Sequence, residues 1–482
     1  MLLACPGPAS ETDSAPVAEG SAQVQSLEAW GLRPGGEATV ALGPSPSFLL
    51  PAANLEPQRK PDFYAGKALS TQPWIRAPAT TDARDGLGPI YHARSCLACH
   101  VKGGRGQSAG DDGLAPATLV RLSLPGRGPH GGPVPEPVYG TQLQPKSTSL
   151  SHQLRGRAGA DAYDDEGVPA EADVRIRWKA RSFIYPDGSA LELRAPELEV
   201  SSLGYGPMDP GVRMGLRHTP ALAGMGLLAG VDAADIERLA DPEDLDGDGV
   251  SGRVNRVWDP ESASMKPGRF GLKANQPSLR VQVAAALNGD MGLSSPVFPE
   301  QPCSANQPRC LAAPDGNDAD GFEVSEALLA SMVDFVASIA VPKRRKPHDP
   351  MVLRGQALFD AVGCADCHVA RYVTVRNHAL PHLASQEIWP YTDLLLHDMG
   401  PELADDREDF EATGREWRTP PLWGAGLARA MHARVGFLHD GRARTIEEAV
   451  VWHDGEGRAS RDRFAALELD DRRALVAFVR SL

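Results

Sequence analysis

Two copies of Cys-x-x-Cys-His constrain this chain more than any other feature of its sequence. They are CLACH at 96–100 and CADCH at 364–368. Such a string attaches c-type haem: both thiols form thioethers with the haem vinyl groups, and the His binds the iron. Zinc ribbons hold their Cys pairs only about 15–20 residues apart, and a redox dithiol needs no following His. We therefore expect two covalently bound c-type haems. Their anchors are Cys96, Cys99, Cys364 and Cys367, and their proximal ligands are His100 and His368.

Length and charge limit the class of protein. A chain of 482 residues has room for about two or three domains, and 42% hydrophobic residues can fill their cores. A net charge of −14 argues against nucleic acid and anionic membrane as partners, and it permits a basic redox partner. No apolar run approaches the ~20 residues that a membrane-spanning helix needs.

Three cysteines lie outside the haem motifs. Cys303 and Cys310 flank a short loop, PCSANQPRC, where we expect a disulfide; the alternative is two free thiols. Cys5 ends the string LLAC, which resembles the site at which bacterial lipoproteins are cut and acylated. The charged and apolar regions of a signal do not precede it, so we expect a longer precursor or a trimmed signal; the alternative is an accidental match. Covalent haem and a lipid anchor together predict a periplasmic or cell-envelope protein that meets the membrane only through its lipid.

The C-terminal part of the chain has the pattern of a small helical haem domain. An amphipathic helix is expected at 351–362, before the second motif, with Gly355 placed for a close helix crossing. Another is expected in the last string, LDDRRALVAFVRSL, capped by Asp470 or Asp471. A first helix, a haem motif and a last helix that crosses the first are the plan of cytochrome c.

The N-terminal part repeats these components. VDFVASI near 333–339 matches VAFVRSL of the last helix, and TPALAGMG at 219–226 matches TPPLWGAG at 419–426. Internal similarity of this kind indicates duplication. We therefore expect a mainly α fold with two cytochrome c-like domains in tandem. The first carries insertions: a Gly- and Pro-rich loop at 101–172 and a β-hairpin at 174–200. The expected boundaries are a lipoprotein-like tether at 1–40, the first domain at 41–342, a linker at 343–350 and the second domain at 351–482.

Several strings between residues 85 and 482 resemble one family. They are GLGPIYHARSCLACHVKGGRG, YGTQLQ, DLDGDGVSGRVNRV, GRFGLKANQPSLRVQVAAALNGDMG, PYTDLLLHDMG, GREWRTPPLWGAGL and FLHDGRARTIEEAVVWH. The chain resembles the bacterial di-haem oxidoreductases, also called thiol oxidoreductases, which are related to di-haem cytochrome c peroxidases and to MauG-like enzymes. The resemblance implies two haems and redox chemistry, but members of such families differ in substrate.

The sixth iron ligands decide what such a protein does, because a five-coordinate haem can bind a small ligand and a six-coordinate haem passes electrons. In the di-haem peroxidases a distal ligand follows the segment that resembles FLHDGRARTIEEAVVWH, which implies His453. The other candidates at the C-terminal haem are His397, Met399, Met431, His432 and His439.

Ala286 follows Ser278 at the same distance in sequence at which His453 follows Thr445. Because Ala cannot bind iron, we expect an open N-terminal haem. Met291, Met214 and His218 stay alternatives as its ligands. The resemblance also implies a Gln and an acid beside the peroxide site, for which Gln282 and Asp290 are the nearest matches. The alternative is a solvated helix Gln and a loop Asp.

The string DLDGDGV at 244–250 resembles the start of a calcium loop. Oxygens from Asp244, Asp246 and Asp248 and the carbonyl of Val250 fit the template, but Asn255 replaces the bidentate Glu. A weak calcium site and a plain Asp/Gly turn are both open.

The leading hypothesis for function is a peroxidase-like di-haem enzyme. Electrons from a small donor of the cytochrome c or cupredoxin class would enter at the His368 haem and cross to the His100 haem, which reduces a small oxidant such as hydrogen peroxide. The alternatives are an electron carrier with both irons six-coordinate, and a structural or binding module with vestigial haems.

Overall fold

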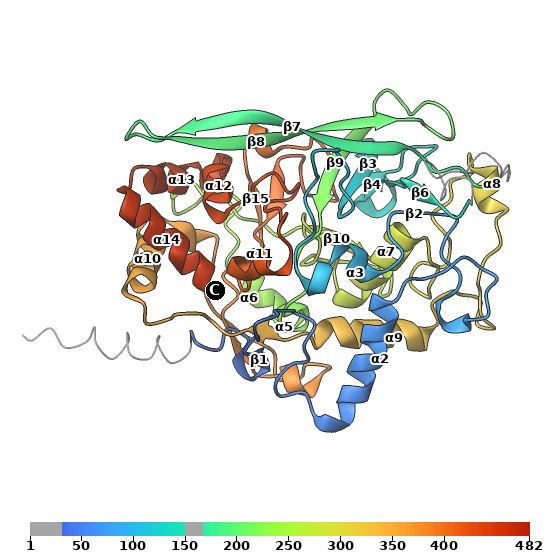
Figure 1. Cartoon of the computed structure of the whole chain (residues 1–482), viewed down its shortest axis with the longest axis horizontal. Coiled ribbons are helices and arrows are strands. Elements are labelled where there is room, and N and C mark those ends of the chain that lie inside the picture. Colours follow the sequence, from blue (N-terminus) through green and yellow to red (C-terminus); the bar gives the residue numbers. More distant parts are fainter. Residues whose placement is uncertain (1–30, 150–166) are drawn as a thin grey trace, which may run out of the picture.

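The computed structural model describes residues 31–149 and 167–482, so Cys5 and most of the expected tether lie outside the described residues. Helices gather at two ends of the molecule, and a long strand ribbon lies across both (Figure 1). The helices are α2 (Lys60–Thr71), α3 (Cys96–Cys99), α5 (Met225–Ala229), α6 (Ala233–Glu237), α7 (Leu279–Met291), α8 (Pro308–Leu311), α9 (Glu326–Ala337), α10 (Pro350–Ala361), α11 (Ala428–Met431), α12 (Ile446–Val451), α13 (Arg458–Ala465) and α14 (Leu469–Ser481).

The expectation of a mainly α fold is wrong. Helix accounts for 29% of the structure and strand for 20%, taken over the described residues. Many strands are only two or three residues long and pair with distant segments, which local periodicity cannot reveal. The strands are β1 (Thr39–Val40), β2 (Ile90–Tyr91), β3 (Thr118–Arg127), β4 (Pro133–Val134), β5 (Gln142–Leu143), β6 (Lys146–Ser147), β7 (Asp173–Ile184), β8 (Ala190–Ser201), β9 (Arg213–His218), β10 (Arg256–Asp259), β11 (Ser264–Pro267), β12 (Val341–Pro342), β13 (Tyr372–Val373), β14 (Glu387–Ile388), β15 (Leu396–Asp398) and β16 (Glu416–Arg418).

The segment expected to be loop at 101–172 contains part of a four-stranded sheet. Strand β3 is paired antiparallel with β9, with Thr118 opposite His218, and it also pairs with β4 and β5. The alternating buried side chains of β3 face a small core that contains Val120, Leu122 and Leu143. The Gly- and Pro-rich composition concealed these strands: β4 and β5 are only two residues long, and β9 lies about a hundred residues beyond β3.

Two helix pairs resemble each other in how they cross. Helix α2 packs on α9, and α10 packs on α14, at opposite ends of the molecule (Figure 1). A Cβ at Gly66 would collide with the backbone of Ser331, and a Cβ at Gly355 would collide with the backbone of Ala474. Glycine therefore allows both pairs to approach closely, as expected for Gly355. The last helix begins at Leu469 without a side-chain cap, so Asp470 and Asp471 lie in its first turn and do not cap it.

Two tandem cytochrome c-like domains are not shown, because the two parts of the chain interlock. Isolated β-bridges join Gln107 to Val435, Val231 to Thr374 and Arg253 to Leu396. The largest apolar core also combines the two parts. It includes Leu227, Val231, Ile236, Phe335, Leu383, Ile388, Leu395 and Trp423. Burial of apolar surface thus ties the expected domains 41–342 and 351–482 into one body.

The expected β-hairpin is present as β7 and β8, which are paired over their full length from Asp173–Ser201 to Ile184–Ala190. Its tip reaches the C-terminal helices: Tyr185 Oη donates to Glu447 Oε1 at 2.9 Å, and Arg472 Nη2 donates to Asp187 Oδ2 at 2.6 Å. The ribbon therefore spans both ends of the molecule (Figure 1).

Candidate functional site

Both Cys-x-x-Cys-His motifs open into one continuous cavity of about 440 Å³. The first motif forms the short helix α3, and the second begins with the 3₁₀ turn Cys364–Asp366. The cavity wall includes all four motif cysteines and both motif histidines, namely Cys96, Cys99, His100, Cys364, Cys367 and His368. The two predicted attachment sites thus share one interior space.

Both motif histidines are oriented as iron ligands are. His100 Nδ1 donates to the carbonyl of Pro220 at 2.8 Å, and His368 Nδ1 donates to the carbonyl of Tyr391 at 2.9 Å. Metal-binding histidines are commonly held in this way, which leaves Nε2 unprotonated. Burial lowers the pKa of each imidazole to about 4, so both are neutral at physiological pH. The residues present therefore fit haem at both motifs.

The four motif thiols do not resemble a redox dithiol. Burial raises the pKa of Cys96 to about 11 and the pKa of Cys99 and Cys364 to about 12, and it also raises the pKa of Cys367. Reactive dithiols need the opposite shift, because the thiolate is the nucleophile. The geometry fits attachment to haem better than thiol–disulfide exchange.

His453 faces the cavity near the second motif. It lies just beyond α12, and its Nδ1 donates to the carbonyl of Ala449 at 2.7 Å, which leaves Nε2 free. Burial lowers its pKa. The pKa of His368 is lowered mainly by burial and also by the charge of His453, and both residues line the same cavity. Met399 and His439 line the same cavity, and His439 stacks on Trp417 with ring centroids 3.6 Å apart.

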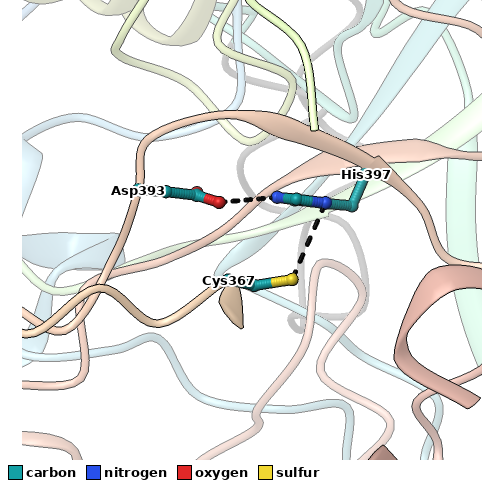
Figure 2. A group of neighbouring side chains, drawn as sticks. All are labelled: Cys367, Asp393 and His397. Atoms are coloured by element: carbon teal, nitrogen blue, oxygen red, sulfur yellow. Dashed lines mark hydrogen bonds and ion pairs between the residues drawn. The ribbon is translucent and has the colours of Figure 1, made fainter. Parts of the chain in front are cut away.

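His397, another candidate ligand, is already occupied at both ring nitrogens. Nε2 bonds Asp393 Oδ2 at 2.7 Å, and Cys367 Sγ lies 3.7 Å from Nδ1 (Figure 2). Nδ1 also bonds Glu456 Oε2 at 2.7 Å. Burial alone would lower the pKa of His397, but the hydrogen bonds to Asp393, Cys367 and Glu456 outweigh burial and raise it well above the usual value. A protonated ring without a free lone pair does not suit iron.

The corresponding helix near the first motif is longer. Ser278 caps α7 by accepting from the Val281 backbone N–H, as Thr445 caps α12 by accepting from Glu448. Helix α7 then continues to Met291, so Ala286 lies inside it and lines the cavity. Gln282 and Asp290 are spaced four residues either side of Ala286 and also line the cavity, as one helix face requires.

Asp290 lies among residues that the sequence did not single out. Gln142 Nε2 donates to Asp290 Oδ1 at 3.0 Å, and Arg121 is directly opposite Gln142 in the pairing of β3 with β5. Burial raises the pKa of Asp290, although Arg121 and Gln142 act in the opposite direction. Gln142 lies in the string YGTQLQ, but only the pairing of distant strands shows its role.

The other candidate ligands of the first haem differ in access. Met291 lines the cavity, whereas Met214 is not part of its wall and is 36% exposed. His218 lines the cavity, but Thr118 Oγ1 lies 3.0 Å from its Nδ1 and the carbonyl of Gly106 lies 3.1 Å from its Nε2. His218 would have to break a buried hydrogen bond to bind iron.

The expected calcium loop brings together Asp241, Asp244 and Asp246, whose carboxylate oxygens lie within 4.8 Å of one another. Asp248 is not in this group, and its Oδ1 accepts from the Val250 backbone N–H at 2.7 Å. These contacts are those of an Asp/Gly turn, and calcium binding stays a prediction.

Cys303 and Cys310 form a disulfide, with their Cα atoms 5.7 Å apart. No helix within 31–149 and 167–482 is both long and apolar enough to cross a membrane.

The chain was compared with curated proteins, solved structures and protein families. No curated protein and no solved structure matches it. A family model described as "Di-haem oxidoreductase, putative peroxidase" matches residues 127–482. The match includes the second motif, α7 and His453, and it starts beyond the first motif. Because it covers well over half of the sequence, the chain belongs to the family of di-haem oxidoreductases.

Proposed function

We propose that this di-haem oxidoreductase reduces hydrogen peroxide beside His100, with electrons received beside His368. The observation that carries the proposal is the difference between the two distal positions. His453 faces the cavity with a free Nε2, whereas Ala286, at the matching position of α7, offers no ligand atom. One position thus suits a six-coordinate iron and the other an open iron.

The attachment residues divide between the two positions. Cys96, Cys99 and His100 would hold one haem, and Cys364, Cys367, His368 and His453 would hold the other. When bound, the haems would supply one-electron redox chemistry. The shared cavity favours transfer between them.

Asp290 is the proposed proton carrier. Reduction of hydrogen peroxide to two waters takes up two electrons and two protons, and a positioned carboxyl can move a proton between the two oxygens. Burial raises the pKa of Asp290, so its carboxyl holds a proton at higher pH than an exposed Asp does. Oδ1 accepts from Gln142 Nε2, so the acid proton is carried on Oδ2. Gln282, one helical turn before Ala286, orients the substrate in this proposal.

A second candidate function is electron transfer alone. Met291 lines the cavity on the same helix as Ala286 and Asp290, and its thioether could complete a six-coordinate iron.

Optical and EPR spectra of the purified holoprotein test the proposal. We expect high-spin and low-spin haem together, in the resting or the half-reduced protein, and a change in the high-spin signal on addition of peroxide. Low-spin haem alone in both states, with no response to peroxide, would contradict peroxidase activity and support the electron carrier. Met291→Ala would then produce a high-spin signal.

The partner and the location are part of the proposal. A net charge of −14 favours a basic electron donor of the cytochrome c or cupredoxin class, and covalent haem attachment favours the periplasm or cell envelope, with Cys5 as the lipid anchor. Labelled palmitate incorporated into the precursor should disappear in Cys5→Ser, and incorporation that persists would exclude the anchor.

A further inference from the structure

Two arginines in the cavity wall have no carboxylate partner. Arg105 donates from Nε to the carbonyl of Gly436 at 2.8 Å and from Nη2 to that of Leu438 at 3.1 Å. Arg418 donates from Nε to the carbonyl of Gly271 and from Nη1 to that of Thr419, both at 2.9 Å. Over 31–149 and 167–482, neither guanidinium hydrogen-bonds or ion-pairs with a carboxylate.

The other cavity arginines differ in this respect. Arg217 pairs with Asp405 at 2.6 Å, Arg461 pairs with Asp454 at 3.4 Å, and the charge of Arg121 interacts with Asp290. Arg269 donates to three carbonyls around the C-terminal end of α5, where the helix dipole favours a cation. Among the described residues, only Arg105 and Arg418 line the cavity with a charge that is compensated neither by a carboxylate nor by the end of a helix.

An uncompensated charge inside a protein is unfavourable. Desolvation lowers the pKa of both guanidinium groups to about 10, which still leaves them charged at neutral pH. Buried charges in proteins are normally paired, because carbonyl oxygens alone do not neutralise them. The charge of Asp393 raises the pKa of Arg418, but the Asp393 carboxylate accepts its hydrogen bond from His397 and not from Arg418. Both arginines therefore need an anion in the cavity.

Each arginine lies near one haem motif and donates to the other part of the chain: Arg105 to the carbonyls of Gly436 and Leu438, and Arg418 to the carbonyl of Gly271. Arg105 follows His100 closely in sequence. The charges of Arg105 and His100 both lower the pKa of His218. Arg418 lies near Asp393, whose backbone N–H donates to the carbonyl of Cys367. In the repeated Thr-Pro strings, the residue before Thr is His218 in the first copy and Arg418 in the second. Arg105 therefore supplies, beside His218, the cation that Arg418 supplies in the second copy.

We propose that Arg105 and Arg418 bind haem propionates, Arg105 at the His100 haem and Arg418 at the His368 haem. Two propionate carboxylates are the anionic side groups of each haem, and a planar guanidinium matches a carboxylate with two parallel hydrogen bonds. Because each arginine donates to at least one carbonyl of the other part of the chain, the propionates would lie where the two parts meet. The proposal rests on the two haems of the family and not on peroxide as substrate.

Midpoint potentials of the holoprotein test the proposal, measured for each haem by spectroelectrochemical titration. Removal of a positive charge beside a propionate stabilises the oxidised haem, so the potential should fall. We expect Arg105→Gln to lower the potential of the His100 haem and Arg418→Gln that of the His368 haem, each with a smaller effect on the other haem. Arg418→Lys keeps the charge and should stay near the parent protein.

The matched control is Arg415→Gln, close to Arg418 in sequence, because Arg415 is an exposed partner of Asp398. The proposal is overturned if the Gln variants shift the potentials no more than this control does, or if Arg418→Lys lowers the potential as far as Arg418→Gln. If Arg418→Gln yields no holoprotein, resonance Raman spectra of Arg418→Lys decide. The propionate bending band should shift as the guanidinium fork is lost, and an unchanged band would exclude Arg418. Peroxide turnover enters none of these measurements, so the outcome is independent of the proposed function.

Discussion

The distal helices at the two haem motifs begin alike and end differently. Thr445 caps α12 and Ser278 caps α7, each through a hydroxyl that accepts from the backbone N–H three residues later. Helix α12 ends at Val451 and leaves His453 beyond it, whereas α7 continues to Met291 and keeps Ala286 in its interior. Two similar helices thus present an imidazole at one position and a methyl group at the other.

This difference shows that the two proposed roles, a six-coordinate iron and an open iron, depend on the length of the helix and on one residue, His453 or Ala286. His453 is held by a hydrogen bond to Ala449 of the preceding helix α12, so its imidazole is oriented locally. Around Ala286 the polar groups come from far away, since Gln142 on β5 positions Asp290. The ligand site is therefore a property of one segment, whereas the proposed reaction site requires the whole fold.

The largest expected effect comes from removal of one attachment motif. Cys96→Ala with Cys99→Ala should leave one haem per chain and abolish peroxide turnover, because the thioethers at the proposed reaction site are lost. The matched variant, Cys364→Ala with Cys367→Ala, should also lose one haem but keep the high-spin signal. Pyridine haemochrome and iron analysis measure the loading. Haem that acid–acetone extracts from the parent protein, or zinc in its place, would contradict covalent attachment.

The next variant makes the first site resemble the second. Ala286→His places an imidazole on the cavity face of α7, where it should bind the iron of the His100 haem. We expect the high-spin EPR signal to disappear and peroxide turnover to fall almost to zero. A high-spin signal that persists would mean that Ala286 does not face the iron.

Asp290→Asn tests the proton carrier. If Asp290 moves the proton, turnover should slow by about 10²–10⁴-fold with unchanged resting spectra. Asp235→Asn, which alters a partly exposed partner of Arg238 outside the cavity, serves as control. Equal turnover in the two variants would remove Asp290 from the reaction.

The same substitution has a predictable effect on stability. The folded-state pKa of Asp290 is raised, so the folded protein binds this proton more tightly than the unfolded chain does. Stability therefore falls as pH rises from the ordinary Asp pKa to the raised one. Asp290→Asn removes this loss, so melting temperatures should depend less on pH in the variant. A steeper dependence would contradict the raised pKa.

His453→Ala should alter the second site with a smaller effect on peroxide binding. The low-spin signal of the His368 haem should become high-spin, and its midpoint potential should change. His439→Ala and Met399→Ala are the comparison variants, since both residues line the same cavity. If one of these alters the low-spin signal and His453→Ala does not, the ligand is wrongly assigned.

The smallest effects concern the two helix crossings. Gly66→Ala and Gly355→Ala each add a methyl group against a neighbouring helix backbone, and overpacking of this kind destabilises by about 1–3 kcal/mol. Chemical denaturation of the holoprotein measures both changes. A loss of stability in only one variant would show that the crossings are not equivalent.

Features carried by consecutive residues could be predicted from the sequence. The helix before the second motif, the closing helices, the β7–β8 hairpin and the position of His453 on the cavity all follow from local strings. The sheet around β3 could not be predicted, because β9, its longest partner, lies about a hundred residues further along the chain. The short strands could not be predicted either, because two or three residues are too few to show an alternating pattern. The expected tandem arrangement of two cytochrome c-like domains is not shown, because residues of both expected domains share the largest apolar core.

The sequence by itself determined the two haem motifs, their histidines and the contrast between His453 and Ala286, because covalent attachment and ligation depend on residue type and spacing within short segments. Only the tertiary structure decided that both motifs open into one cavity and that His397 is held by Asp393 and Glu456. It also decided that Arg105 and Arg418 face this cavity with no carboxylate partner among residues 31–149 and 167–482. Burial, desolvation and charge pairing arise between groups that are distant in the chain, and the sequence pattern does not show which of those groups come into contact.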